Sequence, residues 1–307
     1  MAGMLGSEER ARRQDVGVRD SDDGAIRCSA LPCLEFAQLE AKLVLPPAIE
    51  GPLTRYVALH ELRRRRWLSD AGLGGVLILA GPPGVGKTMT AGAVAQRMGK
   101  DFAREAGGQA VHVSLNLPAL VSDMLGETAK RVAAAFRSIA VSAAQTLTVV
   151  TIDEMESLFF DRARLPPNDP TDLIRAVNEL LKQLDRLRTC PNLLCIGTTN
   201  LLGRIDRALV DRADLVLHFP CPDVPTGTAI LAQAARAAER LDIHVCHEEV
   251  RAAAERLCLR NKTISGRVLA RLPLIAHLET GATDLRARDL VATARRMLDG
   301  GNKYDNV

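Results

Sequence analysis

The sequence carries Gly81-Pro82-Pro83-Gly84-Val85-Gly86-Lys87-Thr88 directly after an apolar run, residues 76–80, and before an alanine-rich helical pattern. This stretch matches the phosphate-loop template G-x-x-x-x-G-K-[ST] at the strand-to-helix junction that the template requires. Its glycines let successive backbone N–H groups point inward, where they and the positive end of the next helix hold a phosphate. A glycine-rich turn without this role is the alternative, and the complete match argues against it. The stretch therefore predicts a nucleoside triphosphate site.

Within that site the two residues that end the motif have separate roles. The ammonium group of Lys87 is expected to reach the β- and γ-phosphates, and the hydroxyl of Thr88 is expected to bind Mg²⁺. The other six residues would surround the phosphates with backbone N–H groups. The sequence thus predicts ATP or a similar nucleotide, with Mg²⁺, as cofactors.

Size and composition narrow the class of protein. A chain of 307 residues has room for about two domains, and a hydrophobic content of 47% is enough for buried cores. The net charge of +3, with acids and bases interspersed, gives no argument for direct nucleic-acid binding. We therefore expect no direct nucleic-acid binding.

Targeting signals give a second constraint. No stretch approaches the roughly 18 consecutive apolar residues of a membrane span, and residues 1–23 have no apolar signal core. Seven cysteines without a C-x-x-C pair are typical of free thiols in a reducing compartment. We expect no membrane association and a location in the nucleus or the cytoplasm. His244-Val245-Cys246-His247 has no second ligand pair, so we assign no zinc site.

The pattern of apolar runs predicts an α/β fold. Short apolar strands recur near residues 111–113, 147–152, 193–196 and 215–219, and helical segments separate them. Such alternation indicates a parallel sheet covered by helices on both faces. Beyond Pro220 only amphipathic helices are predicted, over residues 226–241, 247–259, 264–278 and 283–298, with Gly266, Pro273 and Gly281 as punctuation. We therefore expect a disordered arm (1–30), a large α/β domain (31–221), a helical lid (222–299) and a tail (300–307).

One predicted helix, residues 48–68, carries four consecutive arginines, Arg63 to Arg66, before Trp67. Such a cluster can be a localisation signal or a phosphate-contacting patch. Four cations near a helix C-terminus also suit the helix dipole. We favour the second interpretation, a solvated helix end.

Two acidic residues, Asp153 and Glu154, follow the strand that ends at Ile152. In a parallel sheet this position lies at the same edge as the phosphate loop. Asp153 is expected to complete the Mg²⁺ shell, and Glu154 to polarise the attacking water. Two acids after a strand can also cap the next helix, an alternative that the nearby phosphate loop disfavours.

The next strand leads into Asn200, which places an amide at that edge to orient the water or sense the γ-phosphate. Three arginines then precede the last strand: Arg204, Arg207 and Arg212. Phosphoryl transfer uses positive charge that a neighbouring subunit can supply, with an effect of about 10³ to 10⁵ on the rate. We expect surface ion pairs for Arg204 and Arg207, and we choose Arg212 as the candidate catalytic arginine.

The order of these elements resembles that of the AAA+ ATPases over residues 31–298. A narrower resemblance is to the pachytene checkpoint protein 2 (thyroid receptor-interacting protein 13) family. It rests on Leu31-Pro32 with Glu35-Phe36, on residues 152–158 and 210–214, and above all on Ser265-Gly266-Arg267-Val268-Leu269 in the lid. The resemblance implies that Arg267 is a second nucleotide sensor and that Arg212 reaches into the next subunit. It also implies an ATP-hydrolysing ring, usually a hexamer, that unfolds or converts HORMA-domain proteins of spindle-checkpoint or meiotic-axis complexes, in some cases through an adaptor.

Two features depart from the family pattern. The family has a substrate- and adaptor-engaging domain before the ATPase core, whereas about thirty disordered-looking residues precede Leu31 here. The first pore loop, which the resemblance places at residues 122–127, has Met124-Leu125-Gly126 where an aromatic residue is usual. A flexible thioether can grip apolar side chains; ordinary helix packing is the alternative for Met124 and Leu125.

Other functions fit parts of the same sequence. A different AAA+ machine, such as a severing or proteasomal subunit, would carry another lid sequence and an aromatic pore loop. An ATP-binding scaffold without a substrate domain would agree with the short N-terminal segment. The complete hydrolytic set argues against a scaffold.

Overall fold

The computed structural model describes residues 20–21, 23–66, 72–122, 124, 126–158, 171–260 and 263–301. The chain divides into two compact units. The first contains residues up to 41, 52–81 and 87–218, and the second contains residues 42–51, 82–86 and those from Phe219 onward. Within the described ranges, no helix has both the length and the apolar character needed to cross a membrane.

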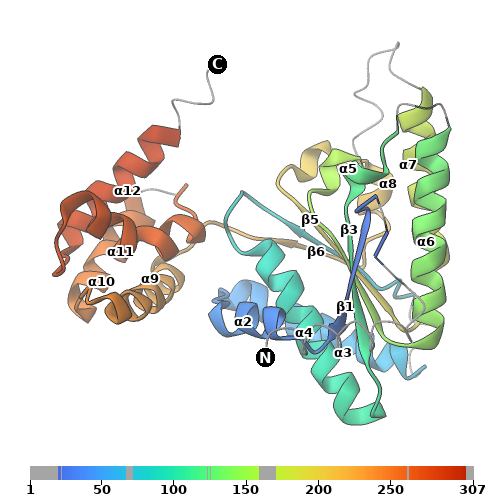
Figure 1. Ribbon diagram of the computed structural model, residues 1–307, viewed down its shortest axis with the longest axis horizontal. Coiled ribbons are helices and arrows are strands. Elements are labelled where there is room, and N and C mark those ends of the chain that lie inside the picture. The colour runs from blue at the N-terminus through green and yellow to red at the C-terminus, as the bar shows by residue number, and fades with distance from the viewer. Residues whose placement is uncertain are drawn as a thin grey trace. The chain divides into compact units, whose positions relative to one another are not determined.

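The first unit is built around a six-stranded sheet in the order β1-β3-β4-β5-β2-β6 (Figure 1). Its strands are β1 (Ile26–Leu31), β2 (Val76–Ala80), β3 (Ala110–Leu115), β4 (Thr148–Ile152), β5 (Leu193–Thr199) and β6 (Leu215–His218). All neighbouring strands are parallel except β1, which pairs antiparallel with β3. The predicted α/β fold with a parallel sheet is confirmed, and an antiparallel edge strand is added to it.

Helices cover both faces of this sheet. They are α2 (Leu34–Lys42), α3 (Pro47–Arg64), α4 (Lys87–Ala106), α5 (Leu117–Leu120), α6 (Glu127–Gln145), α7 (Thr171–Leu187) and α8 (Arg207–Val210). The paired α6 and α7 lie against one face, and α4 lies on the other (Figure 1). In α6, Val132, Phe136 and Ile139 recur at helical spacing and are fully buried. Side chains alternate along β2, so Val76 and Ile78 join the core beneath α6 and α7 while Leu77 and Leu79 are buried on the other face.

The second unit contains the four predicted lid helices, α9 (Val224–Ala238), α10 (His247–Arg260), α11 (Gly266–Thr280) and α12 (Ala287–Gly301). They share an apolar core that includes Leu231, Leu269 and Leu290. Asp223 and Ser265 cap α9 and α11 by accepting backbone N–H groups at 2.9 and 3.3 Å. Gly266 and Pro273 lie inside α11, within the helix that we expected over residues 264–278, and Gly281 caps its C-terminal end. The buried Pro273 is held by packing that outweighs its helix-breaking tendency.

The start of the ordered chain also differs from expectation. We expected a disordered arm up to residue 30, yet β1 begins at Ile26 and pairs with β3 over its whole length. Ile26 and Leu31 are buried, and Arg27 between them is exposed. Because a strand at the edge of a sheet can carry such polar residues, the polar composition of this segment did not indicate a strand. Residues 1–19 and 22 of the predicted arm and 302–307 of the predicted tail lie outside the described residues.

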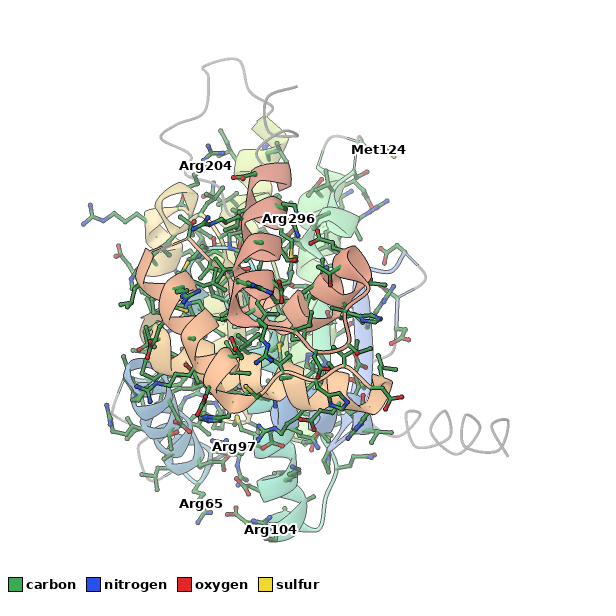
Figure 2. The ribbon with its side chains drawn as sticks, turned by 90° about the vertical axis from the view of Figure 1, so that its left-hand side faces the viewer. Arg65, Arg97, Arg104, Met124, Arg204 and Arg296 are labelled. Atoms are coloured by element: carbon green, nitrogen blue, oxygen red, sulfur yellow. The ribbon has the colours of Figure 1, made fainter. Side chains whose placement is uncertain are left out.

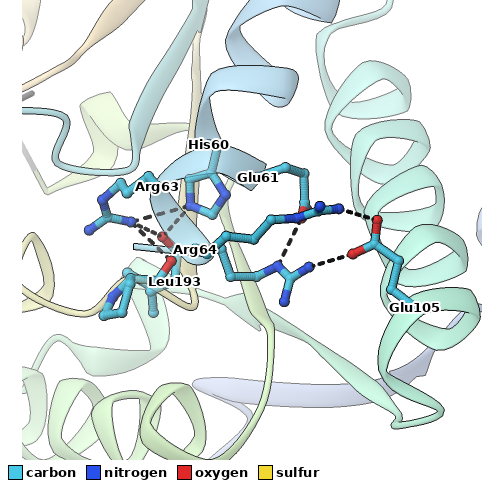
Figure 3. A network of polar contacts seen from close by, with 8 residues as sticks. His60, Glu61, Arg63, Arg64, Glu105 and Leu193 are labelled. Atoms are coloured by element: carbon cyan, nitrogen blue, oxygen red, sulfur yellow. Dashed lines mark hydrogen bonds and ion pairs between the residues drawn. The ribbon is translucent and has the colours of Figure 1, made fainter. Parts of the chain in front are cut away.

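The arginine cluster at the end of α3 is another correction. Arg63 is only 7% exposed, and it donates hydrogen bonds to the carbonyls of Leu73, Arg188 and Leu193 at 2.9, 2.7 and 3.2 Å. Its guanidinium thus ties α3 to the segments that lead into β2 and β5. Beside it, Arg64 pairs with Glu61 and Glu105 (Figure 3). A solvated helix end is therefore the wrong interpretation for Arg63, because burial is matched by a full set of carbonyl acceptors.

His60 lies beside Arg63 in the same network (Figure 3) and is 2% exposed. Its Nε2 is 2.8 Å from the carbonyl oxygen of Leu193, so Nε2 carries the proton and donates it. Its Nδ1 is buried with no hydrogen-bond partner among the described residues. Burial, helped by the Arg63 cation, lowers the pKa of His60 to about 4. The fold therefore requires a neutral ring at this position.

This burial makes stability depend on pH. Between pH 6.5 and about 4, His60 is protonated in the unfolded chain but stays neutral in the folded chain. As the pH is lowered through that window, we expect this residue to reduce the free energy of unfolding by about 1.4 kcal/mol per pH unit. Urea titrations at several pH values across the window should show a smaller slope for His60→Gln than for wild type. His218→Gln, at an exposed histidine of the same unit, is the control. Equal slopes for His60→Gln and wild type would contradict the assignment.

Candidate nucleotide site

The phosphate loop connects β2 to α4, as the motif requires. Gly84 and Gly86 have φ values of 75° and 100°. These left-handed values favour glycine, because a Cβ atom would strain the backbone there. Helix α4 begins at Lys87, so its first N–H groups and the positive end of its dipole lie next to the loop. The sequence choice of glycine and the loop conformation therefore agree.

Lys87 and Asn200 are brought together at the end of β2. The ammonium nitrogen of Lys87 donates to the carbonyl of Gly81 at 2.7 Å and to Oδ1 of Asn200 at 2.8 Å. Strand pairing explains the contact: β2 and β5 are parallel neighbours, and the N–H of Gly81 donates to the carbonyl of Thr199 at 3.2 Å. Lys87 is also 7% exposed. The structure thus holds a buried cation beside the predicted sensor amide.

Thr88 and Asp153 form the second pair of the site. The Thr88 hydroxyl lies 3.2 and 3.1 Å from the two carboxylate oxygens of Asp153. Asp153 also accepts a hydrogen bond from the hydroxyl of Thr198 on β5. Hydroxyl and carboxylate oxygens are the donors that a hard cation such as Mg²⁺ prefers. The donor set therefore fits a nucleotide-bound magnesium ion.

The backbone of Glu154 has an unusual conformation. Its φ of 51° and ψ of 53° put a non-glycine residue in the left-handed region, and its N–H donates to the Thr198 hydroxyl at 3.4 Å. Residues in such sparsely populated backbone conformations cluster at active sites, where the surrounding structure holds them in place. The conformation directs Glu154 away from the regular path of β4. Both carboxylates line a cavity of ≈ 330 Å³, together with Gly24, Arg27, Ser114, Leu115, Asn116 and Pro118.

Two supporting residues were not identified from the sequence. Thr198 contacts both acidic residues, and Glu156 accepts the backbone N–H of Asn200 at 3.0 Å. The only available signal was local, namely a hydroxyl in the strand that leads to Asn200 and a third acid after β4. Neither pattern reveals which side chain reaches across to the neighbouring strand. These contacts fix the positions of Asp153, Glu154 and Asn200 relative to one another.

Arg212 lies at the end of the sheet where β2 begins, whereas Lys87 lies at the end where β2 finishes. The carboxylate of Asp214 accepts the N–H groups of Gly74, Gly75 and Val76, where β2 begins, at 2.7 to 3.0 Å. β2 has five residues, so its two ends are about 17 Å apart. Arg212 itself pairs with Asp185 of α7. The structure therefore separates Arg212 from Lys87 of its own chain.

The other two arginines lie at the surface. Arg204 and Arg207 are both exposed. Arg204 lies at the end of a short helical turn, Leu202–Arg204 (Figure 2), and Arg207 lies at the start of α8. Asp206, between them, caps α8 by accepting the N–H of Ala208 at 2.9 Å.

In the predicted pore loop, Met124 is 71% exposed and precedes α6 (Figure 2). Helix packing is thus the wrong alternative for Met124. Leu125 lies outside the described residues. Gly126 is the N-cap residue of α6 and has a φ of 77°. The neighbouring N–H of Ser122 donates to the Thr128 hydroxyl at 3.1 Å, which fixes the base of the loop.

Arg267 belongs to the second unit, which also contains residues 82–86 of the phosphate loop. Within that unit its backbone N–H donates to the carbonyl of Gly84 at 3.0 Å, and its side chain is exposed. It is the second residue of α11, two positions after the cap Ser265. The start of α11 is therefore in contact with the loop residue whose conformation favours glycine.

Comparison with known proteins supports the same interpretation of the motifs. A family model described as "ATPase family associated with various cellular activities (AAA)" matches residues 77–221. The pachytene checkpoint protein 2 homolog of Oryza sativa subsp. indica is 34% identical over 207 residues, which cover 66% of this chain and 44% of that protein. The chain spans about half the length of the curated relatives it matches.

Two solved structures share the fold. The structure of C. elegans PCH-2 superposes with a TM-score of 0.72 at 25% identity, covering 90% of this chain and 76% of that one. A chain of the E. coli MS115-1 HORMA:CdnC:Trip13 complex also gives a TM-score of 0.72, at 18% identity, covering 91% of this chain and 97% of that one. At 18% identity, the similarity to the chain of the HORMA:CdnC:Trip13 complex shows a shared fold only.

Proposed function

Because the chain belongs to the AAA family of ATPases, in the branch that contains the pachytene checkpoint 2 proteins, we propose that it hydrolyses ATP in a ring of its own copies and thereby unfolds or converts HORMA-domain proteins. The observation that carries this proposal is the position of the charged groups. Lys87, Thr88, Asp153 and Asn200 meet at one edge of the sheet, whereas Arg212 lies at the other.

Each group at the first edge has a role in phosphoryl transfer. Lys87 binds the β- and γ-phosphates, while Thr88 and Asp153 hold Mg²⁺, which neutralises charge on the phosphate oxygens when bound. Glu154 takes the proton of the attacking water, and Asn200 orients that water or contacts the γ-phosphate. Thr198 and Glu156 hold these groups in place. The set is complete except for a cation on the transition-state oxygens.

Arg212 supplies the missing cation to a neighbouring copy. About 17 Å of strand separates the two ends of β2, and an arginine side chain is far too short to cross that distance. A heterologous contact that repeats around a closed ring brings the Arg212 edge of one copy to the phosphate edge of the next. Hexamers are the expected assembly, and Arg267 is the expected sensor from the lid.

The proposed client is a HORMA-domain protein, engaged directly or through an adaptor. Two findings support this: the kinship with pachytene checkpoint 2 proteins and a chain of the same fold within a complex that contains a HORMA protein. Met124, exposed at the start of the pore loop region, is the candidate contact for an extended client segment. A thioether fits apolar side chains of varied shape.

The client assignment is tested with a closed HORMA-domain protein that holds a fluorescent peptide. We expect wild-type protein with ATP and Mg²⁺ to release the peptide, measured as a fall in fluorescence anisotropy. No release is expected with ADP or with the Lys87→Ala variant. If ATP is turned over but the peptide stays bound, with and without candidate adaptors, the client assignment is wrong and another AAA client must be sought.

A further inference from the structure

Building on the proposed function, we propose that Asp185 is a positioning residue that holds Arg212 ready for the active site of the neighbouring copy. The two residues come from different elements of the first unit: Asp185 from the last turn of α7 and Arg212 from the segment between α8 and β6. Nothing in the sequence pattern around either residue indicates that they meet.

The contact between them is bidentate. Nε of Arg212 donates to Oδ1 of Asp185 and Nη2 donates to Oδ2, both at 2.8 Å. Nη1 donates to the carbonyl of Ala208 at 2.7 Å. Arginine has five N–H donors, and these contacts use three of them. Among the described residues, one N–H on each terminal nitrogen is left for a phosphate, and such a pair of donors is the fork that bidentate phosphate recognition uses.

Both partners are fixed to rigid parts of the fold. The face of α7 below Asp185 is buried in the core through Val177, Leu180 and Leu184. On the other side, Asp214 anchors the segment of Arg212 to the start of β2, and it also accepts a hydrogen bond from the Tyr56 hydroxyl at 2.9 Å. A catalytic group held from two rigid supports loses little freedom when it binds.

The charges of the pair are also maintained. The hydrogen bond from Arg212 lowers the pKa of Asp185, and the same contact raises the pKa of Arg212. Both groups thus stay ionised at neutral pH. The side chains of Arg212 and Asp185 are 26% and 48% exposed, and exposed pairs contribute little to stability. A stability role is therefore a weak explanation for so well formed a contact.

The first test compares single variants in steady-state ATP turnover. We expect Asp185→Asn to lower kcat about 10- to 100-fold with KM for ATP nearly unchanged, and Asp185→Glu to recover part of the loss. The melting temperature should move by about 2 °C or less. Glu105→Gln is the matched control, because it removes another part-exposed carboxylate that pairs with arginines, and it should keep wild-type kinetics. A wild-type kcat for Asp185→Asn would overturn the proposal.

The second test asks in which subunit Asp185 acts. A Glu154→Gln subunit has an intact Arg212 but no working site of its own, whereas an Asp185→Asn subunit has an intact site. Mixed in equal amounts, the two should form rings whose turnover exceeds that of the diluted Asp185→Asn protein. Turnover that only matches the dilution would overturn the proposal, because Asp185 would then serve its own site.

Arg212→Ala mixed with Glu154→Gln distinguishes the proposal from its premise. Complementation in this reference mixture but not in the Asp185→Asn mixture rejects the role of Asp185 alone. If the reference mixture also fails to complement, the trans role of Arg212 is wrong, and the role of Asp185 falls with it.

Discussion

Replacing Arg212 with alanine should lower the ATP turnover number about 10³-fold, the lower end of the effect of an arginine supplied in trans. Binding of ATP should be retained, because Arg212 lies at the opposite edge of the sheet from Lys87 in its own chain. Steady-state turnover and titration with a fluorescent ATP analogue measure the two quantities. The same variant should still assemble when ATP is present.

Arg207→Ala is the control for this prediction. Arg207 is an exposed arginine at the start of α8, and we expect its removal to leave turnover close to that of wild type. Turnover that survives in Arg212→Ala and falls in Arg207→Ala would move the catalytic role to Arg207. Loss of ATP binding in Arg212→Ala would instead indicate a structural role for Arg212.

Replacing Glu154 with glutamine should lower turnover about 10²- to 10⁴-fold, the range of a general base. The amide has nearly the shape of the carboxylate but cannot take the proton of the attacking water. ATP binding depends on Lys87 and the loop, so it should persist, and the variant should accumulate as an ATP-bound ring. Single-turnover hydrolysis measured with excess protein isolates the chemical step.

The matched control for this variant is Glu40→Gln. Glu40 pairs with Lys100 on the outer surface of the first unit, and its removal should leave single-turnover hydrolysis near the wild-type rate. An unchanged rate in Glu154→Gln would show that another group accepts the proton. Affinity purification with Glu154→Gln would also retain the client of a stalled ring.

Part of this site could be predicted from sequence because it depends on local pattern and one topological rule. The phosphate loop has a nearly unique spacing, and the carboxyl ends of parallel strands meet at one edge of the sheet. Asp153 and Asn200 each follow a buried strand, so the rule places both beside Lys87. No information about long-range contacts was needed for these residues.

The remaining contacts depend on side chains from distant segments. Thr198 on β5 contacts Asp153 at the end of the neighbouring strand β4, and Asp185 contacts Arg212 from a helix that precedes β5. Arg63 is buried only because carbonyls from two other segments surround its guanidinium. A hydroxyl, an acid or an arginine in these positions has no local pattern that distinguishes it from a solvated residue. Tertiary packing decides such positions.

The most direct test of the composite site is ATP turnover per chain across a dilution series, with assembly followed by light scattering in the same samples. Our account predicts that turnover per chain rises with the assembled fraction and falls to a small residual rate in the monomer. It further predicts that Arg212→Ala abolishes the rise. A monomer that turns over ATP as fast as the assembled protein would contradict the account.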